Sequence, residues 1–120
     1  MTQPAFRLAL SAAGQGVQIA SLGGAVALPE ARELERGVLE GVRQGRTRVV
    51  VDLRAVTDIG PGLLGVLLRI RRGITRVDGR LVLVVAGPPV DDLVRKTLLS
   101  VLIDVTDDRD AAVALVSAPA

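Results

Sequence analysis

The sequence predicts a single α/β domain in which a mixed, mostly parallel sheet of about five strands packs against four helices. Two short apolar segments joined by a Gly-containing turn open the chain, and strand-like and helix-like segments alternate after them. A length of 120 residues is enough for one hydrophobic core but not for two. We therefore expect the order β-β-α-β-α-β-α-β-α in one domain over residues 1–120, ordered over about 5–116 and ending in a short tail of small residues.

The first three elements are a strand hairpin and a helix. Residues 5–11 and 16–22 are short and apolar on either side of a glycine turn, which is typical of a β-hairpin. Pro29 is expected to open a helix at a position where its missing N–H costs nothing, and Gly45 to close it. The inward face of this helix recurs at helical spacing, at Ala31, Leu34, Val38 and Val42.

The middle of the chain holds a buried strand and a second helix. Residues 47–53 form a β-branched run, which is typical of a strand buried on both faces. Pro61 is expected to begin a helix that reaches about Val77, with Arg69, Arg72 and Arg76 on its outer face. The residues expected to point inward are Leu64, Leu67, Leu68, Ile70 and Ile74.

The last third completes the alternation. Residues 81–86 read as a strand, and Gly87-Pro88-Pro89 breaks the chain before a third helix that ends near Ser100. A short strand is expected at 103–105. Thr106 is then predicted to cap a last helix whose first turn holds Asp107, Asp108 and Asp110.

The composition excludes most catalytic chemistry. The chain has no His and no Cys, so it has no thiol nucleophile, no Ser-His-Asp triad and no zinc site of the usual nitrogen and sulfur kind. Asp and Glu could still act as an acid–base pair or hold a metal through oxygen alone. We expect an interaction module rather than an enzyme, with no cofactor, no membrane insertion and a cytoplasmic location.

The charges are unevenly placed although the net charge is only +2. Residues 61–80 contain five arginines and one aspartate, whereas residues 87–116 contain six aspartates and three basic residues. Solvated helix faces would explain this pattern. A basic face that docks an acidic partner or a phosphate is the alternative.

One glycine motif suggests nucleotide chemistry. Gly60, Gly62 and Gly65 match G-x-G-x-x-G between a predicted strand and a predicted helix, the context of a dinucleotide fingerprint. The next predicted strand lacks the acidic residue that the fingerprint requires at its end, and Asp78 precedes that strand. The chain is also too short for a second mononucleotide-binding half. A tight turn before a helix that proline opens explains the motif better.

The same region resembles a known family. Residues 49–59 read VVVDLRAVTDI and residues 64–68 read LGVLL. This is similar to the STAS domain of bacterial anti-sigma factor antagonists, which typically reads V-V-x-D-L-x-x-V-x-x-I-D-S-S-G-L-G-x-L. The resemblance continues through residues 79–84 to residues 105–108, so it covers most of the chain. It implies a bacterial, non-enzymatic regulator of transcription that acts by binding proteins.

The chain departs from the family pattern at its switch. Gly60 stands where the family has an acidic residue, and Gly62 stands where it has the serine that accepts phosphate. Val26 replaces the aspartate of a G-x-x-D pattern that often follows the second strand. Phosphorylation at the usual position is therefore not expected, although Gly62→Ser is expected to be tolerated by the fold. Thr57 is the nearest hydroxyl, and we interpret it as a packed strand residue.

The resemblance also implies a partner surface. Asp58 is expected to cap the turn or to face a partner's cation, and Leu63 to add an apolar contact or a steric block. The expected partner-binding residues are Gly23, Gly24, Asp58, Gly60, Pro61, Gly62, Leu63 and Arg69.

The implied partners are an anti-sigma kinase-like protein or other STAS-domain proteins, with a homodimer left open and nucleic acid not expected. Two alternatives remain, a STAS-type accessory domain of a transport assembly and an anion- or nucleotide-binding regulator. The arginines 69, 72 and 76 of the second predicted helix are the feature that would support anion binding.

Overall fold

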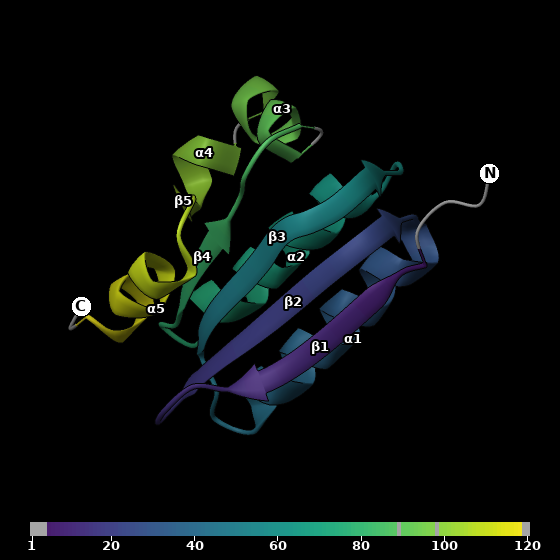
Figure 1. Ribbon diagram of the computed structural model, residues 1–120. Coiled ribbons are helices and arrows are strands. Elements are labelled where there is room, and N and C mark those ends of the chain that lie inside the picture. The colour runs from purple at the N-terminus through teal and green to yellow at the C-terminus, as the bar shows by residue number, and fades with distance from the viewer. Residues whose placement is uncertain (1–4, 89, 98, 119–120) are drawn as a thin grey trace.

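The structure is a five-stranded sheet with helices on both faces (Figure 1). It is a computed structural model that describes residues 5–88, 90–97 and 99–118. The strands are β1 (Arg7–Ala12), β2 (Val17–Val26), β3 (Arg48–Ile59), β4 (Arg80–Val84) and β5 (Asp104–Thr106). The helices are α1 (Leu28–Arg43), α2 (Leu63–Thr75), α3 (Val90–Lys96), α4 (Leu99–Leu102) and α5 (Arg109–Ser117).

The strands lie in the sheet in the same order as in the chain, β1-β2-β3-β4-β5. β1 and β2 form the predicted antiparallel hairpin, and every later pair is parallel. Each parallel pair needs a connection that crosses from one end of the sheet to the other, and the helices supply it. The predicted fold class and the mixed, mostly parallel sheet are confirmed.

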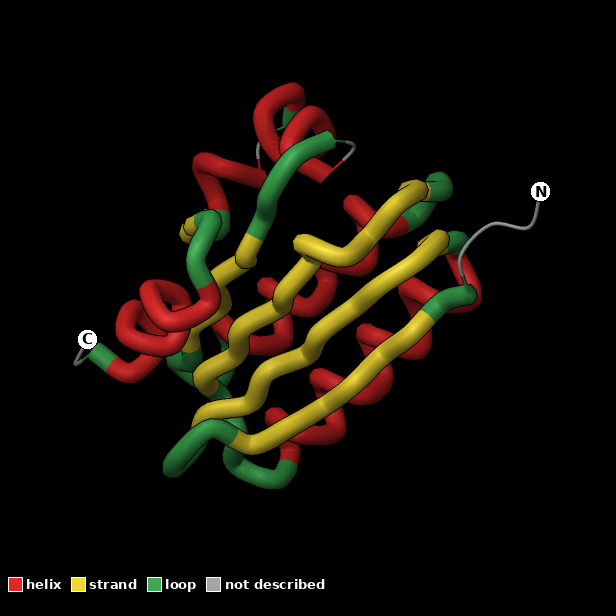
Figure 2. Tube along the Cα trace, in the orientation of Figure 1, coloured by secondary structure: helices red, strands yellow, loops and turns green. Residues whose placement is uncertain are grey.

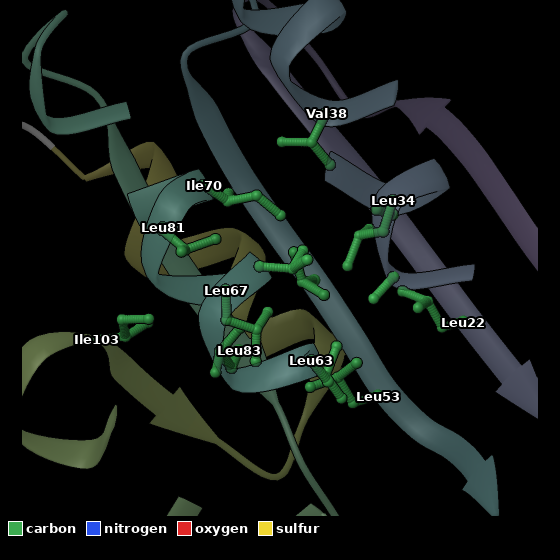
Figure 3. Packing of buried hydrophobic residues seen from close by; sticks show 14 of the residues in the cluster. Leu22, Leu34, Val38, Leu53, Leu63, Leu67, Ile70, Leu81, Leu83 and Ile103 are labelled. Carbon is green, nitrogen blue, oxygen red and sulfur yellow. The ribbon is translucent and has the colours of Figure 1, made fainter. Parts of the chain in front are cut away.

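The helices form two unequal layers, which Figure 2 shows on either side of the strands. α1 and α2 cover one face, and their inner residues join the larger core cluster together with buried residues of α3 and α4. Figure 3 shows part of this cluster, with Leu34 and Val38 of α1 and Leu67 and Ile70 of α2 on the same face of the sheet. α5 covers the other face over β3 and β4, where Ala112 and Val116 complete a smaller cluster.

The first half of β3, residues 49–53, is buried on both faces, as its β-branched sequence predicts. Val49 and Val51 lie in the larger cluster, whereas Val50 lies in the smaller one under α5. This alternation follows from the two-residue period of a strand. The central position of β3 in the sheet is what fixes the place of the turn that follows it.

Two strands are longer than the sequence predicts. β2 continues past Leu22 to Val26, and β3 continues past Leu53 to Ile59. Their extensions pair with each other and contain two register shifts, one near Gly23 and one near Ala25. Such irregularities bend a ladder without ending it, so the glycines that suggest a loop lie within a strand.

The structure corrects three predictions about the helices, which concern a helix boundary, a helix cap and a buried residue. The predicted third helix is divided into α3 and α4. After α3, the Thr97 hydroxyl donates to the Leu93 carbonyl and accepts the Leu99 N–H. Thr106 is not the cap of α5: Asp108 is, and its carboxylate accepts the N–H groups of residues 110 and 111. Leu68 is 36% exposed instead of buried, and Leu63 and Val66 take the inward positions. Pro89 of the predicted break and residues 119–120 of the predicted tail lie outside the described residues.

Candidate protein-interaction site

The turn at residues 60–62 joins the end of β3 to the start of α2, beside the point where β2 leads into α1. The Gly60 N–H donates to the Val26 carbonyl at 2.8 Å, which ties the turn to the end of β2. Gly62 is the N-cap of α2, and its carbonyl accepts the Val66 N–H at 2.9 Å. No side chain caps this helix start. We call residues 60–62 the β3–α2 turn.

Gly62 has a backbone conformation and surroundings that both favour glycine. Its φ is +105°, in the left-handed region that side chains rarely adopt. A Cβ at this position would lie 2.6 Å from Leu28 Cδ1 at the start of α1. A serine here would therefore be strained, so Gly62→Ser is expected to lower stability, and its tolerance by the fold stays a prediction.

Gly60 is confined by backbone atoms. A Cβ at Gly60 would lie 3.1 Å from Ala27 Cα and 3.3 Å from the Val26 carbonyl oxygen. Because backbone cannot rotate away as a side chain can, an aspartate at this position would require the start of α1 to shift. The chain thus lacks both family side chains, and it packs the start of α1 close to the positions that they would occupy.

The residues around the turn divide into exposed and buried ones. Pro61 is exposed, and so is Asp58 in β3. Asp58 accepts a hydrogen bond from the Thr57 hydroxyl at 3.4 Å. Thr57 is itself exposed, so the interpretation of Thr57 as a packed residue is wrong. Leu63 is fully buried in the larger core cluster (Figure 3), so its side chain is not available to a partner.

Gly23 and Gly24 lie inside β2 rather than in a loop. Both are buried, and Gly23 pairs with Arg7 of β1 and with Ala55 of β3. The Arg7 guanidinium lies over Gly23, since a Cβ there would come within 2.5 Å of it. Gly24 has a φ of +82°, next to a register shift. The two glycines lie in the irregular part of β2, and they do not form a loop beside the turn.

Arg69 lies two helical turns beyond Gly62 and faces α1. Its Nε donates to Glu35 Oε1 at 3.0 Å, and its side chain remains 49% exposed. It borders an open groove of about 530 Å³ between α1 and α2. We call this the arginine groove, and its lining residues are Arg32, Glu35, Arg36, Leu39, Arg43 and Arg69.

A second charged cluster lies on the opposite face of the sheet, where no site was predicted. Asp52 is buried, and its carboxylate accepts Arg54 Nε at 3.0 Å, Arg54 Nη2 at 2.8 Å and the Arg54 backbone N–H at 3.1 Å. The pair borders a hollow of about 340 Å³ together with Ser21 and Arg109. Asp and Arg two residues apart in a strand share one face, and this spacing is the signal that could have revealed the pair.

Opposing effects set the pKa of Asp52. Burial acts to raise it, because removal from water disfavours the carboxylate. The hydrogen bonds from Arg54 and the positive charges of Arg54 and Arg109 outweigh burial and hold the pKa of Asp52 below its ordinary value. Asp52 is therefore a charged structural anchor rather than a proton donor near neutral pH.

The described residues hold no group of three or more His, Cys, Asp or Glu side chains placed to bind a metal ion. Over the same residues, no helix has the length and apolar character needed to span a membrane. The observed features are a hydrogen-bonded glycine turn, an arginine groove and a paired charge cluster. All three can contact another molecule without chemical change.

Comparison with known proteins identifies the family. Residues 8–104 match the family model described as "Mlab, STAS domain". A Bordetella bronchiseptica protein named as an anti-sigma factor antagonist, BtrV, is 32% identical over 99 residues, which cover 82% of this chain and 85% of that protein.

Two solved structures agree in fold. An anti-sigma factor antagonist from Mycobacterium paratuberculosis has a TM-score of 0.83 at 22% identity, covering 95% of this chain and 96% of that one. The Bacillus cell fate determinant SpoIIAA in its phosphorylated form has a TM-score of 0.74 at 14% identity, covering 91% of this chain and 99% of that one. The resemblance inferred from the strand and turn residues is confirmed, and the chain belongs to the STAS domain family, with anti-sigma factor antagonists among its similar proteins.

Proposed function

We propose that this chain is a non-enzymatic antagonist that binds an anti-sigma factor of the kinase-like type and thereby regulates transcription. We further propose that its binding is not switched by phosphorylation at the family's usual position. The observation that carries this proposal is the β3–α2 turn. Glycine occupies residues 60 and 62, and the start of α1 packs against both.

Three features support a docking role for this turn. Its backbone is held by hydrogen bonds to β2 and within α2, so a partner would meet a rigid surface. Pro61 and Asp58 are exposed beside it, whereas the apolar Leu63 is buried. Rigid surfaces bind with a small loss of conformational entropy. Contacts to Pro61, Asp58 and the turn backbone would then provide the specificity.

The proposal is tested by affinity purification of the tagged chain from the bacterium that encodes it, followed by mass spectrometry. We expect a kinase-like anti-sigma factor to be recovered with the wild type and lost with Pro61→Arg. Gln15→Arg is the matched control, because Gln15 is exposed in the hairpin turn at the opposite end of β2 and the charge change is the same. Recovery of no kinase-like protein, or equal recovery with both variants, would contradict the proposal. Recovery of only a STAS-domain protein or a second copy of this chain would favour those partners instead.

The absence of a switch is tested in the purified complex. On addition of ATP and Mg²⁺ we expect the partner to remain bound and the mass of this chain to stay unchanged. Phosphate on Thr57 together with release of the partner would overturn this part of the proposal. Thr57→Val is the variant that identifies the site, because it removes the hydroxyl and keeps a β-branched side chain in β3.

A further inference from the structure

The arginine groove between α1 and α2 contains more arginine side chains than form ion pairs with nearby glutamates. Four of its lining residues are arginines and one is a glutamate. Glu35 pairs with Arg69, and Glu40 pairs with Arg43 at 2.6 Å. Within the described ranges of the chain, Arg32 and Arg36 take part in no ion pair or side-chain hydrogen bond. Their guanidinium groups are therefore available to an outside ligand.

The positive surface continues beyond the groove. Arg72 and Arg76 follow Arg69 along α2 at helical spacing, and both are exposed. Toward the other end, α1 begins at Leu28, whose side chain borders Gly62. Arg32 lies one helical turn after Leu28. A partner docked at the β3–α2 turn would thus meet the groove next.

The spacing of the arginines favours an extended ligand over a small anion. Arg32 and Arg43 are eleven positions apart on α1, which is about 16 Å along a helix. The four guanidinium groups of the groove, spread over that length, do not all converge on one phosphate, although Arg32 and Arg36, which are available to a ligand, are only about 6 Å apart along the helix. A peptide with carboxylates one or two helical turns apart would match them, because each Arg binds a carboxylate in a fixed geometry.

The rest of the lining favours a protein segment over a nucleic acid. Leu39 offers an apolar contact between the charged residues, and Glu35 would repel a continuous run of phosphates. The chain's one aromatic residue, Phe6, packs against the larger core cluster, so no aromatic platform is available for stacking bases. Both features fit a segment that alternates carboxylates with aliphatic side chains.

We infer that the arginine groove is a docking surface for an acidic, amphipathic segment of a partner protein. The inference rests on the proposed function in one respect only, that the occupant is a protein. Electrostatic attraction of this kind speeds association and weakens as salt screens it. The groove would supplement the β3–α2 turn, which offers few side chains of its own.

The inference is tested with a fluorescein-labelled 16-residue helical peptide in which Glu recurs at every fourth position with Leu between. We expect saturable binding by fluorescence anisotropy that weakens as salt is raised. Arg32→Gln with Arg36→Gln should weaken it roughly twofold to twentyfold, the range expected for two exposed ion pairs. The control is Arg95→Gln with Lys96→Gln, which removes the same charge from exposed positions on α3.

Several outcomes would overturn the inference. Absence of saturable binding would do so, and so would equal weakening by the groove variant and the control, or equal binding of a counterpart peptide with Lys for Glu. Tighter groove-dependent binding of a single-stranded oligonucleotide, of phosphatidylglycerol vesicles or of inorganic phosphate would assign the groove to that ligand instead.

Purification with the groove variant separates this inference from the proposed function. If the groove variant retains the kinase-like partner at wild-type affinity while Pro61→Arg loses it, the groove inference fails and the proposed function stands. If the acidic peptide binds in the groove but no such partner is recovered, the proposed function fails and the groove inference stands.

Discussion

Residue 62 holds the start of α2 through backbone geometry that a side chain would disturb. Its φ of +105° and its distance to Leu28 both oppose a Cβ. We therefore expect Gly62→Ser to lower the free energy of unfolding by about 1–3 kcal/mol, the usual cost of such strain. Urea denaturation followed by circular dichroism measures it.

A second glycine separates the two causes. Gly14 has a φ of +103° but nothing within 4 Å of an added Cβ, so Gly14→Ser reports backbone strain alone. The further loss in free energy of unfolding of Gly62→Ser, relative to Gly14→Ser, then measures the contact with Leu28. Leu28→Ala should recover part of that further loss when it is combined with Gly62→Ser. Equal losses at residues 14 and 62 would show that contact with Leu28 has no energetic effect.

The Asp52–Arg54 pair leads to a pH-dependent prediction. The pKa of Asp52 is held below its ordinary value, so its contribution to stability is present above the pKa of an unfolded aspartate and is lost as pH falls through the folded pKa. Arg54→Met leaves the buried carboxylate without its cation, and burial then raises the pKa of Asp52. We expect a loss of about 1–2 kcal/mol at pH 7 that shrinks as the pH is lowered toward 4.

Denaturation curves at pH 4 and pH 7 test this pair. Arg95→Met is the control, since Arg95 forms an exposed ion pair with Asp91 one helical turn away. Its expected cost is below about 0.5 kcal/mol at either pH. A loss in Arg54→Met that stays constant with pH would show that Asp52 does not carry the effect.

At the scale of the element, α5 depends on its cap. The Asp108 carboxylate accepts two backbone N–H groups at the helix start, whereas the Thr106 hydroxyl accepts only the N–H of Asp108. Asp108→Ala should therefore lower the free energy of unfolding by about 1 kcal/mol, and Thr106→Ala by clearly less. Urea denaturation of the two variants decides between the observed cap and the one that the sequence predicts.

Elements were predictable where local pattern and packing agree. The inward residues of α1 follow helical periodicity, and Gly45, with a φ of +97°, ends the helix as expected. The extension of β2 through Gly23 and Gly24 was not predictable, because Gly23 is held in the strand by pairing with β1 and β3, and Gly24 by pairing with β3. The division between α3 and α4 was not predictable either, because the apolar periodicity of this segment does not mark a break.

At the scale of the molecule, the site depends on contacts between distant segments. The sequence indicates that residues 60 and 62 lack the family side chains, but not that Ala27 lies against position 60 and Leu28 against position 62. Arg69 was predicted beside the turn, and its partner Glu35 lies 34 residues away in the chain. The groove arises only because α1 and α2 share one face of the sheet. Such placement follows from topology rather than from local spacing.

The two faces of the sheet differ in the helices that cover them. Two long helices hold the larger cluster, whereas α5 is the helix whose residues complete the smaller one. Arg48 of β3 anchors the end of α5, because its Nη1 donates to the carbonyls of Val116 and Ala118 at 2.5 and 2.8 Å. A cation at a helix C-terminus also interacts favourably with the helix dipole.

Removing this anchor should loosen one face of the molecule and leave the other intact. We expect Arg48→Met, which keeps an unbranched apolar side chain at the position, to speed amide hydrogen exchange in residues 109–118 while α1 and α2 stay protected. The global free energy of unfolding should fall by about 1–2 kcal/mol, the range for charge-assisted hydrogen bonds at a partly exposed site. Arg46→Met is the control, since the Arg46 side chain bonds to Gln44 instead. Uniformly faster exchange in all helices would mean that the two layers unfold together, because α5 then could not open separately from the larger core.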